Sequence, residues 1–268
     1  MTMTATMCHA GVTMPGSAPS FAQDLACALD PVALARAAGI HPDPWQIRYL
    51  RSMHPRKLLN CSRQSGKSLA VSVKAVHRAL YHPGALVLML SPSLRQSGEL
   101  FKKALSVYRD LGRPVSAESE TALTLTLDNG SRIVSLPGKE GTIRGYSGAN
   151  LILIDEASRV ADELYFSVRP MLAVSGGTLE APSTPFGTRG WWYSAWRETL
   201  QDWERYEVPA TSCPRIPAAF LEEEKQTMGE WWFRQEYECL FMDAQSAAFR
   251  RADIDAAFEE GLETWGLL

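Results

Sequence analysis

The stretch that most constrains this chain is residues 60–68, with the sequence Asn-Cys-Ser-Arg-Gln-Ser-Gly-Lys-Ser. An apolar run with strand character precedes it, and a segment suited to a helix follows and ends near Leu80. This order is typical of a phosphate-binding loop, in which successive backbone N–H groups at a helix N-terminus surround a polyphosphate. In such a loop Lys67 reaches the β- and γ-phosphate oxygens, and the Ser68 hydroxyl holds Mg²⁺.

The match to the usual phosphate-loop motif is incomplete. That motif has a glycine five residues before Gly66, where this chain has Cys61. A polar turn that caps an ordinary helix therefore remains an alternative for this stretch taken alone.

A second stretch, residues 151–156, reads Leu-Ile-Leu-Ile-Asp-Glu. Four consecutive apolar residues predict a strand buried on both faces, as in a parallel sheet covered by helices. Ligands of such sheets bind at the carboxyl ends of the strands, so Asp155 and Glu156 are expected to meet the phosphate loop there. Asp155 would orient Mg²⁺ or its waters, and Glu156 would polarise the water that attacks the γ-phosphate. The alternative is that the two carboxylates cap the following helix.

Strand and helix patterns alternate along the chain, which predicts a mainly parallel sheet flanked by helices, the α/β fold of P-loop NTPases. Two β-rich runs flank Asp128-Asn129-Gly130, and an Asn-Gly turn between such runs predicts a hairpin that extends the sheet edge. The expected strands are 58–61, 85–90, 121–127, 131–136, 151–154, 177–182 and 205–208. The expected helices are 24–39, 44–50, 67–80, 94–111, 191–200, 216–227, 230–239 and 253–260.

Composition bounds the rest of the chain. With 268 residues and 46% hydrophobic content it can bury a large core. We expect a mobile leader over 1–20, an ATPase core over 21–210 and a small helical appendage over 211–268. Residues 1–199 carry a net charge of +6 and residues 200–268 carry −9, which together give the net charge of −3. The basic part permits contact with a polyanion without demonstrating it.

Several classes of protein are disfavoured. The apolar runs are too short to span a bilayer, and the N-terminus lacks the basic region of a signal peptide, so a cytoplasmic location is expected. Five scattered cysteines and five histidines show neither zinc-site nor disulfide-framework spacing, so reduced thiols are expected.

The combination of motifs resembles the ATPase half of the large terminase subunit, the DNA-packaging motor of tailed phages and prophages. The likeness extends over about residues 44–251, and terminases are known for deviant phosphate loops, as at Cys61 here. It is carried by the segments 45–46, 62–68, 143–148, 151–158 and 183–185.

The resemblance implies a role for each motif. Gln46 contacts adenine, Arg144 in the Gly-rich loop 138–148 acts as a finger on a neighbouring subunit, and residues 183–185 couple hydrolysis to movement. Small hydroxyl residues at a strand end also suit such a sensor, although a plain Pro-Gly turn is the alternative there. The candidate catalytic residues are Glu156, Lys67, Arg144 and Arg63; the nucleotide-binding residues are Gln46, Ser62, Arg63, Gln64, Ser65, Gly66, Lys67 and Ser68; the metal-binding residues are Ser68 and Asp155; and the coupling residues are Ser183, Thr184 and Pro185.

The implied ligands and partners are ATP, Mg²⁺, double-stranded DNA, a portal protein, a small terminase subunit and further copies of the chain in a ring. The family normally adds a nuclease domain after the ATPase, and we expect no nuclease activity from the residues that follow here. Another DNA-dependent ATPase and a non-catalytic nucleotide-binding protein are the alternatives. Basic residues that could contact the DNA backbone are Arg48, Arg51, Arg56, Lys57, Lys102 and Lys103.

Overall fold

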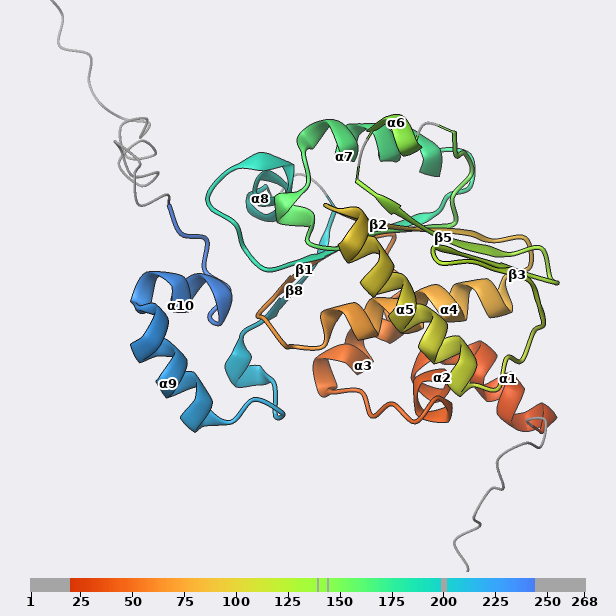
Figure 1. Ribbon diagram of the computed structural model, residues 1–268, viewed down its shortest axis with the longest axis horizontal. Coiled ribbons are helices and arrows are strands. Elements are labelled where there is room, and N and C mark those ends of the chain that lie inside the picture. Colours follow the sequence, from red (N-terminus) through yellow and green to blue (C-terminus); the bar gives the residue numbers. More distant parts are fainter. Residues whose placement is uncertain (1–19, 139, 144, 199–201, 244–268) are drawn as a thin grey trace, which may run out of the picture.

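The computed structural model describes residues 20–138, 140–143, 145–198 and 202–243, and these residues form an eight-stranded sheet with helices on both faces (Figure 1). The strand order is β3-β4-β5-β2-β6-β7-β1-β8, in which neighbours from β5 to β8 are parallel and the β3-β4-β5 edge is antiparallel. The strands are β1 (Arg56–Cys61), β2 (Leu86–Ser91), β3 (Ala117–Glu120), β4 (Thr124–Leu127), β5 (Arg132–Pro137), β6 (Leu151–Ile154), β7 (Thr178–Ser183) and β8 (Glu204–Val208). The predicted fold class is thereby confirmed.

Helices cover both faces of the sheet. In Figure 1, α1 to α5 lie on one face and α6 to α8 on the other. The helices are α1 (Phe21–Leu29), α2 (Pro31–Ala37), α3 (Pro44–Arg51), α4 (Lys67–Tyr81), α5 (Leu94–Asp110), α6 (Glu140–Ile143), α7 (Asp162–Val168), α8 (Gly190–Arg197), α9 (Ala218–Met228) and α10 (Glu230–Glu236). Short 3₁₀ turns are η1 (Ala157–Arg159), η2 (Arg169–Leu172) and η3 (Ala210–Ser212). No described helix has the length and apolar character needed to cross a membrane.

Alternation along the central strands places one hydrophobic core on each face. Leu59 and Leu153 pack into the core that includes α1 to α5, whereas Leu58 and Ile152 pack into the core that includes α7 and α8. Successive side chains of a strand point to opposite faces, so an unbroken apolar run suits a strand covered on both sides. The four apolar residues of β6 are all buried, as predicted.

Two local predictions need correction. The helical spacing over 24–39 belongs to two helices, because Pro31 has no N–H to continue α1 and Asp30 Oδ1 accepts a hydrogen bond from Val32 N at 3.0 Å to cap α2. The polar loop 138–148 contains the short helix α6. The hairpin is confirmed, with Gly130 at φ +80°, and β3 adds an edge strand that was not predicted.

The C-terminal helices α9 and α10 lie at the end of the molecule beyond β1 and β8 (Figure 1). They enclose a small hydrophobic cluster of their own, formed by Ala210, Leu221, Phe233 and Tyr237. The predicted helix over 253–260 and the leader over 1–20, apart from Ser20, lie outside the described residues.

Candidate functional site

The loop between β1 and α4 has the backbone of a compact turn. Gln64 and Gly66 have φ values of +58° and +87°, and Ser65 Oγ donates to Ser62 O at 2.9 Å. Gly66 is the N-cap of α4, which begins at Lys67, so the loop ends at a helix N-terminus as a phosphate-binding loop requires. Cys61, at the position of the missing glycine, is fully buried, and burial raises the pKa of its thiol to about 12.

Gly66 is held between two side chains from distant parts of the sequence. A Cβ at this position would lie 2.7 Å from Gln46 Nε2 and 2.9 Å from Arg215 Nη2. Gln46 Nε2 donates to Gly66 O at 3.2 Å, while its Oε1 accepts from Asp43 N at 2.8 Å. The structure therefore places Gln46 against the loop, and its contact with adenine stays a prediction.

The acidic pair at the end of β6 meets the start of α4. Lys67 Nζ lies 3.1 Å from Glu156 Oε1, and Ser68 Oγ donates to Asp155 Oδ2 at 3.4 Å. Burial, together with the neighbouring charge of Glu156, raises the pKa of Asp155 to about 6. Burial disfavours the charged form of Lys67, but Glu156 and Asp155 outweigh it and raise the Lys67 pKa. The two sequence motifs thus lie together at the carboxyl ends of the parallel strands.

Glu156 adopts a backbone conformation that is uncommon for a residue with a side chain. Its φ is +51°, in the left-handed region, and its N–H donates to Asp155 Oδ1 at 3.1 Å. This turn ends β6 and directs the chain into η1, so the two carboxylates follow the strand without capping an α-helix. Arg159 Nε, on η1, lies 3.9 Å from Glu156 Oε2.

Ser183, Thr184 and Pro185 are buried at the end of β7, beside this turn. Ser183 Oγ accepts a hydrogen bond from Ser158 N at 3.1 Å and lies 2.8 Å from Ser158 Oγ. Ser158 Oγ donates to Thr184 O at 2.7 Å. The turn after the acidic strand and residues 183–185 are therefore joined by direct hydrogen bonds.

A cavity of about 360 Å³ opens at these strand ends, lined by Arg63, Gln96, Glu156, Arg159, Thr184 and Glu236. Glu236 Oε2 lies 3.8 Å from Arg63 Nη1, and Glu236 Oε1 lies 3.6 Å from Arg159 Nη2. The Arg63 side chain is 64% exposed, so it can reach a ligand in the cavity.

The charged residues of this region that were not predicted from sequence include Arg159, Glu236 and Arg215. Arg215 Nη2 donates to Ser65 O at 3.0 Å, and Arg215 Nη1 donates to Asp43 Oδ1 at 2.9 Å. Arg215 and Glu236 come from the C-terminal segment, 150 or more residues after the loop, and no local pattern marks them. Arg159 follows the acidic pair by three residues, which is the one signal that could have identified it.

Among the other predicted residues, Arg48 lies 4.9 Å from the centre of the Tyr206 ring, Arg56 is half-buried at the start of β1, and Lys103 is exposed on α5. Arg144 lies outside the described residues. Lys57 is wrong as a DNA contact, because its side chain is 1% exposed and its Nζ lies 2.9 Å from Glu180 Oε1. Arg51 pairs with Asp30 at 2.7 Å, and Lys102 pairs with Glu99 at 2.8 Å, both on the surface.

Comparison with known proteins gives consistent matches. The family model described as "Terminase large subunit, T4likevirus-type, N-terminal" matches residues 58–256. The large terminase subunit of Thermus virus P23-45 is 25% identical over 252 residues, covering 81% of this chain and 52% of that protein, and the one from Thermus phage G20c matches equally. The chain spans about half the length of these curated relatives.

Solved structures share the fold. The large terminase ATPase domain of Thermus phage P74-26 superposes with a TM-score of 0.69 at 22% identity, covering 78% of this chain and 97% of that one. The large terminase of a thermophilic bacteriophage gives a TM-score of 0.65 at 12% identity, covering 75% of this chain and 54% of that one. Since the family model spans most of the sequence, this chain belongs to the family of T4likevirus-type terminase large subunits, matching their N-terminal part.

Proposed function

We propose that this chain is an ATP-hydrolysing motor domain that drives double-stranded viral DNA into a procapsid. The observation that carries the proposal is the meeting of Lys67 with Glu156 and of Ser68 with Asp155 at one sheet edge, in a chain of the terminase family. The large terminase of the thermophilic bacteriophage compared above has been solved with ADP and with ATP-gamma-S, which supports nucleotide binding by this fold.

The residues at the site fit ATP with Mg²⁺. Ser68 Oγ and Asp155 Oδ2 supply two hard oxygen donors 3.4 Å apart, which Mg²⁺ prefers. A cation there would also favour the ionised form of Asp155, whose pKa burial raises to about 6. When bound, Mg²⁺ neutralises charge on the phosphates. We assign phosphate binding to the loop and to Lys67, and adenine recognition to Gln46.

The chemical step is assigned to Glu156. Lys67 can pair with either Glu156 or a γ-phosphate, and transfer of Lys67 to the phosphate leaves Glu156 Oε1 without its cation. Its carboxylate can then accept a hydrogen bond from the attacking water and polarise it. Arg63 lines the same cavity and would bind phosphate oxygens, and Arg144 would act on a neighbouring site.

Movement is assigned to residues 183–185. A change in the position of Glu156 would move Ser158, because η1 connects the two residues. Ser158 is hydrogen-bonded to both Ser183 and Thr184. We infer that hydrolysis alters this set of hydrogen bonds and shifts the end of β7. Residues 21–210 would form the motor core and 211–268 an appendage that closes over the loop through Arg215 and Glu236.

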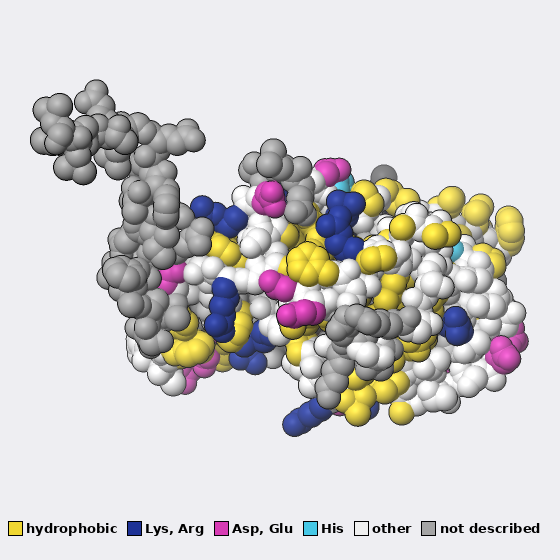
Figure 2. Space-filling view, turned by 90° about the horizontal axis from the view of Figure 1, so that it is seen from above, with side chains coloured by type: hydrophobic (Ala, Val, Ile, Leu, Met, Phe, Trp, Pro, Cys, Tyr) yellow, Lys and Arg dark blue, Asp and Glu magenta, His cyan; other side chains and the backbone are white. Residues whose placement is uncertain are grey.

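The proposed partners are duplex DNA, a portal protein, a small terminase subunit and further copies of this chain, in the cytoplasm of a bacterial host. Contacts with DNA of any sequence must be made to the phosphate backbone. The described part of the face seen in Figure 2 carries Lys and Arg side chains singly, between apolar and acidic ones. We therefore do not assign DNA binding to that face.

ATP turnover with and without duplex DNA tests the proposal, with Lys67→Ala as the inactive control. A DNA-stimulated ATPase is expected for the wild-type chain. Absence of turnover, with nucleotide binding retained and assembly partners present, would point to the non-catalytic alternative. Unwinding of duplex DNA would point to a helicase.

A further inference from the structure

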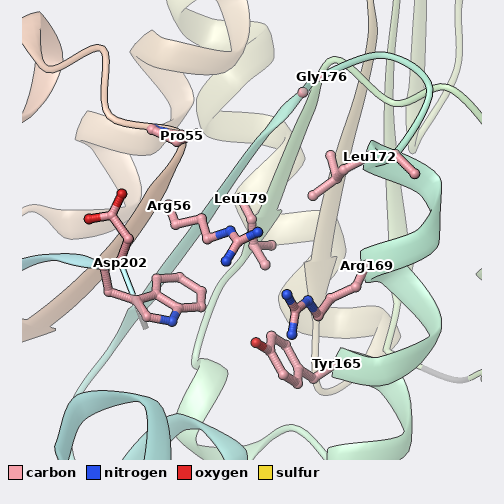
Figure 3. A pocket seen from close by; sticks show the side chains of 11 residues that line it. Pro55, Arg56, Tyr165, Arg169, Leu172, Gly176, Leu179 and Asp202 are labelled. Carbon is pink, nitrogen blue, oxygen red and sulfur yellow. The ribbon is translucent and has the colours of Figure 1, made fainter. Parts of the chain in front are cut away.

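A second cavity, about 510 Å³ in volume, lies at the opposite end of the parallel strands from the phosphate loop, where β1 and β7 begin (Figure 3). Arg56 from β1, Tyr165 from α7, Arg169 and Leu172 from η2 and Leu179 from β7 are among its lining residues. The phosphate loop follows the other end of β1. A strand of six residues is roughly 20 Å long, so this cavity is separate from the proposed nucleotide site.

Two arginines give the cavity its charge. Figure 3 shows the guanidinium groups of Arg56 and Arg169 and the hydroxyl of Tyr165 turned toward the same space. The Arg169 guanidinium lies over the Tyr165 ring, 5.6 Å from its centre. Within the described part of the chain, no carboxylate lies at ion-pairing distance from either guanidinium. One acidic residue, Asp202, also lines the cavity, and its Oδ1 lies 3.1 Å from His54 Nε2.

The third polar group is a hydrogen-bond donor. Burial, with a smaller contribution from the Glu198 carboxylate, raises the pKa of Tyr165 against the opposing charges of Arg169 and Arg56, so the phenol stays protonated at neutral pH. The Tyr165 ring stacks on Trp191 with ring centres 4.2 Å apart, which fixes its orientation. Two cations and a neutral O–H donor thus face one space.

We propose that this cavity binds a phosphomonoester carried on an organic group of about nucleotide size. A phosphomonoester has a charge near −2 and three acceptor oxygens, which match two guanidinium groups and one hydroxyl. A carboxylate has one charge and two oxygens, so it would leave one guanidinium without an anion. Leu172 and Leu179 form an apolar part of the cavity wall, and the cavity is larger than a bare phosphate ion requires.

The same chemistry has two sources, a free nucleotide and the 5′-terminal phosphate of a DNA strand. An internal duplex phosphate fits less well, because it carries one charge and duplex binding needs an extended basic surface, not a hollow. This inference does not depend on the proposed motor function, since the cavity and the nucleotide site use different residues.

The test uses chains that carry Lys67→Ala, so that the phosphate loop contributes little to binding. Equilibrium dialysis measures radiolabelled AMP and inorganic phosphate, with adenosine and glutamate as competitors. Fluorescence anisotropy compares a 5′-phosphorylated oligonucleotide with its 5′-hydroxyl counterpart. If AMP binds and neither oligonucleotide does, the ligand is a free nucleotide. If the 5′-phosphorylated oligonucleotide binds more tightly than its 5′-hydroxyl counterpart, the ligand is a DNA end. Either outcome supports the site.

Arg169→Gln and Arg56→Gln should each weaken phosphate binding at least about ten-fold, because each removes a charge-assisted hydrogen-bonding group. Arg36→Gln, at an exposed arginine of α2, is the matched control and should change nothing. Introduced into the wild-type chain, Arg169→Gln should leave ATP turnover unchanged, which also shows that the variant folds. The proposal is overturned if neither cavity variant weakens phosphate binding, if AMP and both oligonucleotides bind without regard to the phosphate, or if glutamate competes as well as phosphate does.

Discussion

Lys67 Nζ lies 3.1 Å from Glu156 Oε1, so the cation of the phosphate loop and the carboxylate after β6 neutralise each other across the site. Their side chains are 10% and 23% exposed, and a partly buried pair of this kind leaves an uncompensated charge when one partner is removed. In the proposed cycle the γ-phosphate replaces Glu156 as the partner of Lys67. In that proposal the pair would link nucleotide binding to the release of the Glu156 carboxylate.

The first prediction concerns this carboxylate. Glu156→Gln keeps the shape of the side chain but removes the charge that polarises water, so hydrolysis should fall about 10² to 10⁴-fold while ATP still binds. Steady-state phosphate release and titration with a fluorescent ATP analogue measure the two effects. Lys67→Ala is the contrast, because binding and hydrolysis should weaken together. Wild-type turnover by Glu156→Gln would show that another group activates the water.

The second prediction concerns Gly66. Gly66→Ala places a Cβ 2.7 Å from Gln46 Nε2 and 2.9 Å from Arg215 Nη2, at a φ of +87°. The left-handed conformation alone costs roughly 1–2 kcal/mol for alanine. Gly39→Ala is a matched control, since Gly39 has φ +74° and nothing within 4 Å of its Cβ position.

Both variants should therefore lose stability in chemical denaturation, and Gly66→Ala should lose more. Only Gly66→Ala should also lose nucleotide affinity, because it displaces Gln46 and Arg215 from the loop. Equal losses of stability and unchanged nucleotide affinity in the two variants would mean that the contacts of Gln46 and Arg215 do not shape the site.

The sequence predicted that Lys67 and Glu156 lie at one site because each follows a local pattern. Residues 151–154 form an unbroken apolar run of the length typical of a strand buried on both faces. Gly66-Lys67-Ser68 combines a turn with the start of a helix. Parallel strands then bring the two patterns to one edge. Local pattern and tertiary structure agree here, as is usual for a well-specified fold.

The contacts of Arg215 and Glu236 could not be predicted in this way. Each depends on how the chain after β8 returns to the loop, and neither residue belongs to a periodic or turn pattern that specifies its partner. The burial of Lys57 was missed for a related reason. Its partner Glu180 lies on the neighbouring strand β7, 123 residues away, and strand order is a tertiary property.

A third prediction tests the proposed coupling segment. Ser158→Ala removes the hydroxyl that lies 2.8 Å from Ser183 Oγ and donates to Thr184 O, at a cost of about 1–2 kcal/mol in stability. Basal ATP hydrolysis should remain within a few fold of wild type, whereas stimulation by DNA and packaging should fall strongly. Ser106→Ala, at a serine whose hydroxyl bonds to Asp110 on the surface, is the control. If Ser158→Ala packages DNA normally, the link between η1 and β7 does not transmit movement.

A fourth prediction concerns pH and stability. His77 Nε2 lies 3.1 Å from Ala28 O, and burial lowers the pKa of His77 to about 4. An unfolded chain has a histidine pKa near 6.5, so below that pH the unfolded state binds more protons and stability falls. This loss is complete once the pH falls below the folded-state value. Between pH 7 and 4 it should amount to about 1–3 kcal/mol.

The His77→Gln variant separates this effect from the titration of carboxylates. Glutamine can still donate to Ala28 O but does not titrate. Urea denaturation at several pH values should therefore show a shallower acid loss for the variant than for the wild-type chain, between pH 6.5 and 4. Parallel pH profiles for the two chains would show that His77 does not contribute.

The last prediction concerns Arg144 and the proposed ring of subunits. An arginine that acts on a neighbouring site stabilises charge on the transferred phosphoryl group and can contribute about 10³ to 10⁵ in rate. Arg144→Ala and Glu156→Gln subunits should each be inactive alone. The first retains an intact pocket and the second an intact arginine, so a mixture under assembly conditions should recover part of the wild-type turnover. An arginine that pairs only with Asp155 or Glu156 of its own chain gives no such recovery. A mixture as inactive as its components, when wild-type subunits assemble and hydrolyse ATP under the same conditions, would exclude action across an interface.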